Sequence, residues 1–209
     1  MIARVIRAMT QNQTSEHDRL FRKACELIKG EIQLHGQPAL SEPSWLLTRR
    51  LTRAIGLFKR VLEINPDNWS AMWLVGKVYQ RFRNTQEALS WFDRSSRINP
   101  SQPDVLREAS ICSMEIGRND VAIAFALRAA QLDPSDSGLH ANLALAYLLA
   151  GRVIDAQTTI NQVLVGDPSD SISQSIQSIV QHFVSSGRVP PTTTPGLLNY
   201  WHKNLKYPA

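Results

Sequence analysis

Apolar residues recur along this chain at the three- and four-residue spacing of amphipathic helices. The first such segment runs from Ser15 to about Leu34, and a long second segment begins near Pro43 after a loop over residues 35–41. Near the other end, residues 171–186 place their apolar side chains on one helical face and polar side chains elsewhere. These patterns predict an all-helical protein whose helices each bury one face.

The middle of the chain is an internal repeat. Prolines recur every 34 residues, and an alanine stands twelve residues before each of them. The prolines are Pro66, Pro100, Pro134 and Pro168, and the alanines are Ala54, Ala88, Ala122 and Ala156. Each proline is expected to end a helix, because it lacks an N–H and disfavours helix in the residue before it. A unit of this length cannot bury its own apolar face, so neighbouring units must stack.

The other half of the unit repeats as well. Residues 69–100 contain Met72, Val75, Gly76 and Tyr79, followed by Ala88, Phe92 and Pro100. This spacing resembles the W-x2-L-G-x2-Y, A-x3-F and P positions of the tetratricopeptide-repeat (TPR) family, and the resemblance covers about residues 42–168. It implies a right-handed superhelical α-solenoid of helix-turn-helix repeats with a C-terminal capping helix.

Residue size supports the same interpretation. Small residues at Gly76, Ser110, Ala144 and the four repeat alanines would let the two helices of a unit approach closely. Phe92 would fill the space between neighbouring units. The predicted segments are a flexible leader at 1–14, an N-terminal helix and degenerate first repeat at 15–68, repeats at 69–102, 103–136 and 137–170, a capping helix at 171–187, and a spacer and aromatic tail at 188–209.

The tail poses a separate question. Residues 189–195 are rich in proline and threonine, which predicts an extended spacer. Leu197, Tyr200 and Trp201 follow it and would form an exposed apolar patch unless something covered them. We expect the tail to dock beside Leu145, Leu148 and Ile176, in its own chain or in a neighbour, and a disordered tail is the alternative.

Composition restricts the functional classes. The net charge is +5, and the basic excess lies mostly in the N-terminal third. Cys25 and Cys112 are far apart and lie among apolar residues, so we expect buried thiols and no disulfide, as in the reducing cytoplasm. No stretch reaches the roughly 18 apolar residues of a membrane span. Residues 1–14 have basic and apolar side chains, which leaves a targeting arm as the alternative to a frayed leader.

Catalytic motifs are absent from the sequence. The five histidines are scattered without the spacing or the companions of a metal site. There is no glycine-rich phosphate loop, no nucleophile elbow, and no cysteine with an evident histidine partner. We therefore expect a protein that is not an enzyme and needs no cofactor or metal.

The resemblance implies where a partner would bind. In TPR proteins the first helix of each unit lines the concave wall, and this groove binds a protein or peptide segment. The matching positions include Trp73, Lys77, Gln80, Arg81, Arg107, Ile111, Met114, Ala141, Asn142, Leu145 and Leu148. The earlier end would be cationic and aromatic and the later end aliphatic. With Arg81 and Arg107 exposed, reversing both charges would weaken binding without changing stability.

The carboxylate clamp of chaperone-binding TPR domains is not present, because only Lys77 fits its pattern. Two alternatives remain at this point. Nucleic-acid or anionic-surface binding would use the basic residues of the first long helix, but aromatic residues do not interleave with them as in single-strand binders. These are Arg49, Arg50, Arg53, Lys59 and Arg60. Self-association through the tail would give a homo-oligomer.

Overall fold

The computed structural model describes residues 15–32 and 41–204, and this part of the chain is all-helical, with ten helices and no strand. The chain divides between Ile98 and Asn99 into two compact units, which are described separately. The predicted leader at 1–14, most of the predicted loop at 35–41, and the tail residues after Asn204 lie outside the described residues. No helix in the described part is long and apolar enough to cross a membrane.

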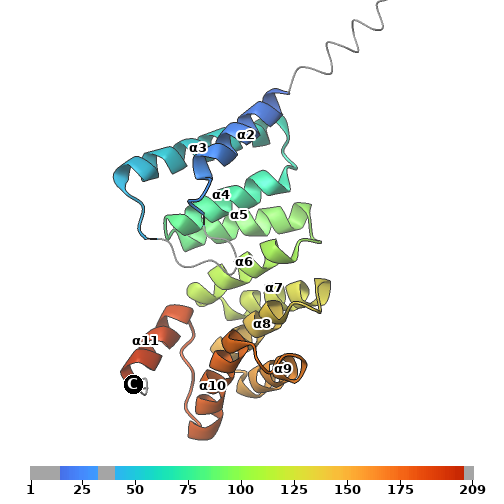
Figure 1. Ribbon diagram of the computed structural model, residues 1–209, viewed down its shortest axis with the longest axis vertical. Coiled ribbons are helices and arrows are strands. Elements are labelled where there is room, and N and C mark those ends of the chain that lie inside the picture. Colours follow the sequence, from blue (N-terminus) through green and yellow to red (C-terminus); the bar gives the residue numbers. More distant parts are fainter. Residues whose placement is uncertain (1–14, 33–40, 205–209) are drawn as a thin grey trace, which may run out of the picture. The chain divides into compact units, whose positions relative to one another are not determined.

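The described residues of unit 1 form four helices, shown in blue to green in Figure 1. They are α2 (Glu16–Ile28), α3 (Trp45–Ile64), α4 (Trp69–Arg81) and α5 (Thr85–Ile98). Consecutive helices pack against each other. The α2 helix takes the place of a first repeat helix, and its Phe21 ring meets the Phe58 ring of α3 edge-on, with 5.7 Å between centroids. The core of this unit therefore includes the degenerate first repeat.

The first helix is shorter than the sequence pattern predicts. The prediction ran to about Leu34, whereas α2 ends at Ile28. Gly30 adopts a left-handed φ of 73°, and the N–H of Glu31 donates to the carbonyl of Ile28 at 2.9 Å. Glycine adopts this conformation without steric strain and commonly ends helices in this way. Apolar residues continue at helical spacing after Ile28, but the left-handed backbone at Gly30 ends the helix before them.

The two helices of the repeat at 69–102 approach closely at Gly76. A Cβ at this position would lie 2.5 Å from Cε1 of Phe92, and the Phe92 side chain is fully buried. The repeat pattern predicts Phe92 between neighbouring repeats, and this contact joins α4 to α5 within one repeat. Gly76 is thus required because it leaves room for the aromatic ring on the facing helix.

Unit 2, as far as it is described, has six helices between residues 99 and 204. They are α6 (Pro103–Glu115), α7 (Asn119–Leu132), α8 (Ser137–Leu149), α9 (Val153–Gly166), α10 (Ser171–Ser186) and α11 (Thr194–Asn204). The α6 and α7 helices pair, as do α8 and α9, and α10 packs on both α8 and α9. In the first pair, the Ser110 hydroxyl donates to the carbonyl of Ala122 at 2.9 Å. Both are small-residue positions of the predicted repeat.

Short turns connect these helices in a regular way. Gly117 and Gly151 both adopt a φ of 75° between the two helices of a repeat. At the equivalent place in unit 1, Arg83 adopts a φ of 56°, a conformation that is unfavourable for a residue with a Cβ. Between repeats, Asn68, Asp136 and Asp170 cap the helices that follow by accepting backbone N–H bonds. The residues after the repeat prolines thus begin the next helix.

The cap of α10 should make stability depend on pH. The Ser173 hydroxyl and then the backbone N–H of Ile172 donate to the Asp170 carboxylate and lower its pKa below the usual 3.8. A lowered folded pKa adds stability that is complete above the unfolded value and is lost as the pH falls through the folded value. We expect Asp170→Asn, which keeps an acceptor but does not titrate, to lose less stability than the wild type between pH 5 and pH 2. Urea unfolding would measure this, with Glu63→Gln as the control away from a helix N-terminus.

Candidate partner-binding face

The first helices of the repeats in unit 2 form one surface. The α6 helix packs on α8, and α8 packs on α10. We call the surface of these three helices the first-helix face of unit 2. Its α6 and α8 helices include the predicted site residues Arg107, Ile111, Met114, Ala141, Asn142, Leu145 and Leu148. The other four predicted residues, Trp73, Lys77, Gln80 and Arg81, belong to α4 in unit 1.

None of the predicted site residues is fully exposed. Lys77, Arg107, Met114, Ala141 and Leu148 are buried. The others are half-buried, namely Trp73, Gln80, Arg81, Ile111, Asn142 and Leu145. The expectation that Arg107 is an exposed cation is therefore wrong, since only 5% of this residue is accessible.

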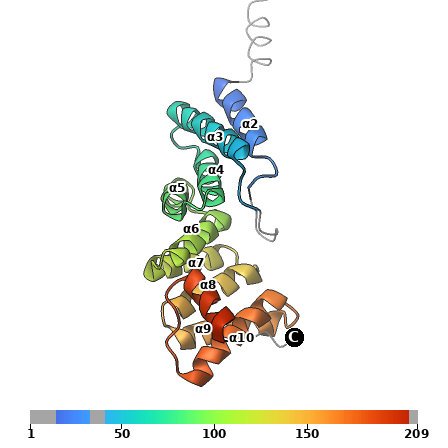
Figure 2. The same ribbon diagram turned by 90° about the vertical axis from the view of Figure 1, so that its left-hand side faces the viewer.

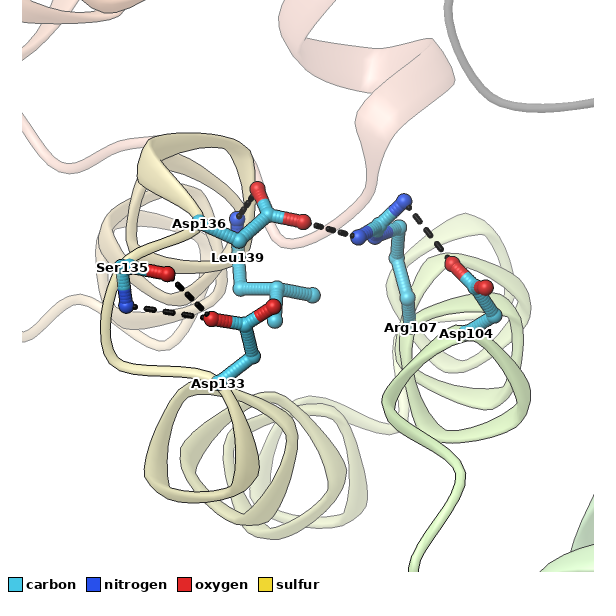
Figure 3. Close-up of polar contacts among 6 residues, drawn as sticks. All are labelled: Asp104, Arg107, Asp133, Ser135, Asp136 and Leu139. Atoms are coloured by element: carbon cyan, nitrogen blue, oxygen red, sulfur yellow. Dashed lines mark hydrogen bonds and ion pairs between the residues drawn. The ribbon is translucent and has the colours of Figure 1, made fainter.

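Arg107 is held between two carboxylates (Figure 3). Its Nη2 donates to Oδ2 of Asp136 at 2.6 Å, and its Nη1 lies 3.1 Å from Oδ1 of Asp104. Asp104 is one turn earlier on α6, whereas Asp136 precedes α8, so the guanidinium joins two repeats. Asp136 also accepts the N–H of Leu139 and so caps α8. The positive charge of Arg107 is therefore compensated by carboxylates of the same chain.

The turn that supplies Asp136 is itself ordered by local bonds. Asp133 accepts from the hydroxyl of Ser135 at 2.7 Å and from its backbone N–H at 3.2 Å (Figure 3). These bonds, the hydroxyl bond first, lower the pKa of Asp133 below its usual value. The Asp-Pro-Ser-Asp sequence thus folds into a turn that presents one carboxylate to the α8 N-terminus and to Arg107.

A segment distant in sequence lies against this face. The α11 helix follows a short linker after α10 and packs against α6 (Figures 1 and 2). Thr193 caps α11 by accepting the N–H of Gly196 at 3.1 Å, and Pro195 falls in the first turn, where its missing N–H is tolerated. The predicted spacer at 189–195 therefore ends earlier, because Thr194 and Pro195 are helical.

Aromatic contacts also join α11 to α10. The Tyr200 hydroxyl lies 3.0 Å from Nε2 of His182 and accepts from Nη1 of Arg188 at 3.2 Å. The Tyr200 ring is 5.2 Å from the ring of Phe183, and the Trp201 ring is 6.1 Å from that of His182. The α11 helix thus docks in its own chain, where it contacts α6, His182, Phe183 and Arg188.

Sequence reasoning did not identify His182 as a contact of the tail. It treated this residue only as one of five scattered surface or packing histidines. No local sequence pattern predicts that His182 and Phe183 contact Tyr200 and Trp201. These residues meet only because the chain reverses direction at residues 187–193, between α10 and α11. Gly187, with a φ of 63°, ends α10 and begins this reversal.

Two of the basic residues of α3 pair with acidic residues in α2 or just after it. Arg50 pairs with Glu31 at 2.5 Å, and Arg60 pairs with Glu16 at 3.0 Å. The guanidinium of Arg49 lies 4.9 Å from the centre of the Trp45 ring. These contacts leave a weaker basic surface than the sequence of α3 alone indicates.

The described residues contain no group of three or more metal-ligating side chains that could hold an ion. Neither Cys25 nor Cys112 forms a disulfide, and burial raises the pKa of the Cys25 thiol. A raised pKa keeps more of a thiol protonated at neutral pH, which lowers its reactivity as a nucleophile.

Comparisons with known proteins agree with the helical architecture. Residues 48–103 match the family model for the tetratricopeptide repeat. YrrB, described as a TPR protein with an unusual peptide-binding site, has a TM-score of 0.60 and 16% identity, over 90% of this chain and 93% of that chain. MamA has a TM-score of 0.61 and 15% identity, over 91% of this chain and 93% of that chain.

A third similar structure is pilF of Pseudomonas aeruginosa, with a TM-score of 0.60 and 17% identity over 82% of this chain and 72% of that chain. No curated protein matches the sequence. Since the identities to these structures are low, the likeness shows the fold alone.

Proposed function

Because this chain is a tetratricopeptide-repeat protein, we propose that it is a non-catalytic scaffold that binds a partner protein on the first-helix face of unit 2. The TPR fold is consistent with protein–protein interaction, and YrrB, of the same fold, is described as having a peptide-binding site. The proposal needs no cofactor, metal or nucleic acid.

The observation that carries this proposal is the position of α11. A helix of 11 residues already lies against α6 and contacts α10, and it uses apolar and aromatic side chains to do so. A face that accommodates one amphipathic helix has the shape for another, as in the helix-in-groove mode of recognition. We propose that the partner segment is a short amphipathic helix.

Apolar contact, rather than ion pairing, would then provide most of the affinity. Arg107 is compensated by Asp104 and Asp136, so a partner carboxylate would compete with two existing ion pairs. Ile111 and Leu145 are half-buried on α6 and α8, and apolar contacts with them would stabilise a bound helix. Arg81 on α4 remains our proposed cationic contact in unit 1.

A matched pair of substitutions tests the proposed face. Partners would first be identified by photo-crosslinking from position 111 of the full chain. Their affinity would then be measured for Ile111→Glu and for Leu127→Glu, whose side chain is exposed on α7. We expect Ile111→Glu to weaken binding by about tenfold or more, equivalent to about 1.4 kcal/mol, because a charge would enter an apolar contact.

Leu127→Glu should bind as the wild type does, and circular dichroism should show that both variants are folded. Equal affinities for all three proteins would place the partner elsewhere. Loss of binding only in Leu127→Glu would move the site to the second helices.

A further inference from the structure

The α11 helix is bound through one side only. Leu197 is 3% accessible, whereas its neighbour Leu198 is 56% accessible. Tyr200 and Trp201, three and four residues after Leu197, are half-buried and contact α10. Positions i, i+3 and i+4 lie on one side of a helix. The docked side of α11 therefore consists of a leucine, a phenol and an indole.

The linker ends close to the turn after α6. A Cβ at Gly117 would lie 3.3 Å from Cγ2 of Thr193, so the backbone of this turn lies close to the residue that caps α11. At the other end, His182 and Arg188 hold the Tyr200 hydroxyl. These contacts fix the start of α11 to the α6–α7 turn and its aromatic side to α10.

The stability of α11 depends on this docking. Isolated helices shorter than about 12 to 15 residues are marginal in water, and α11 has 11 residues. Segments with few buried side chains open locally at a free energy well below that of global unfolding. In contrast to α11, the α6 and α8 helices bury residues along their whole lengths. The α11 helix is thus the part of unit 2 that is expected to detach most easily.

We propose that α11 is an internal ligand of the first-helix face of unit 2, so that α11 and a partner helix bind this face in a mutually exclusive way. This inference rests on the function proposed above and adds the regulation of its site. The docked residues define the partner chemistry, which is a short helix with an aliphatic anchor and aromatic side chains three and four residues later. The attachment of α11 through residues 187–193 gives it a high effective concentration, so a free helix binds more weakly until α11 is released.

Two neighbouring leucines make the test specific. Leu197→Asp places a charge on the buried side of α11, and Leu198→Asp places the same charge on its exposed side. Both changes are made in the full chain. The probe is a fluorescein-labelled peptide with the sequence of residues 188–204, and its binding is followed by fluorescence anisotropy. Hydrogen exchange of the amides of residues 194–204 reports whether α11 has been released.

We expect Leu197→Asp to show fast exchange in α11 and to bind the peptide at least about tenfold more tightly than the wild type, because the fraction of open sites rises. Leu198→Asp should match the wild type in both measurements. A peptide carrying the same Leu197→Asp change should not bind. If Leu197→Asp fails to fold, Tyr200→Phe removes the bonds to His182 and Arg188 without adding a charge, and it should show the same changes to a smaller degree.

Four outcomes would overturn the inference. The first is fast exchange in Leu197→Asp without any gain in peptide affinity, and the second is unchanged exchange in both folded variants. The third is a dimer by light scattering in which α11 docks on a second copy. A partner that binds the wild type and Leu197→Asp equally well, and still requires Ile111, would also overturn this inference but leave the proposed function intact. Failure of the proposed function would instead appear as full partner binding by Ile111→Glu.

Discussion

Phe92→Ala is expected to lower the free energy of unfolding by about 3 to 5 kcal/mol. The ring is fully buried, and its edge lies where a Cβ of Gly76 would be, so its removal leaves a cavity between α4 and α5. Helix backbones that meet this closely cannot move together to fill such a space, because interiors are densely packed. Urea unfolding followed by circular dichroism would measure the change.

Glycine substitutions provide the control for this contact. Gly76→Ala should also destabilise the protein, since the new methyl would lie 2.5 Å from the Phe92 ring. Gly56 lies in the middle of α3 with nothing within 4 Å of its added Cβ, so Gly56→Ala should stabilise by about 0.5 to 1 kcal/mol through helix propensity. Effects of the same sign at both glycines would show that helix propensity, and not contact with Phe92, decides the result at Gly76.

Arg107→Glu is expected to destabilise unit 2 by about 3 to 5 kcal/mol. The substitution would bring a third carboxylate to Asp104 and Asp136 at a position where the side chain is 6% accessible. Like charges repel strongly where water is excluded, and the α8 cap formed by Asp136 would be disturbed as well. Thermal and urea unfolding would both report the loss.

Arg128→Glu is the matched control, because Arg128 is exposed on α7, and its effect should stay within about 0.5 kcal/mol. A double-mutant cycle of Arg107→Met with Asp136→Asn would isolate the ion pair, since asparagine can still cap α8. A stable Arg107→Glu protein with weakened partner binding would restore the original expectation that Arg107 is an exposed binding residue.

The sequence by itself determined the fold class of this protein. The 34-residue spacing of Pro66, Pro100, Pro134 and Pro168 predicted the helix pairs, and the match of residues 48–103 to the TPR family model agrees with this spacing. The range predicted for the helix at 171–186 is that of α10. These features were predictable because periodicity, proline and small residues act on the local backbone or on the nearest helix.

Tertiary structure decided which residues of the candidate site are buried and what they contact. The repeat register placed Arg107 on the first-helix side, but only folding brought Asp136, 29 residues away, to its guanidinium and turned an expected surface cation into a buried link between repeats. Likewise, the tail sequence showed that Leu197 and Tyr200 needed cover, yet nothing local to them indicated α6, His182 or Phe183. Local pattern specifies which face of a helix is apolar, whereas the three-dimensional path of the chain decides what that face meets.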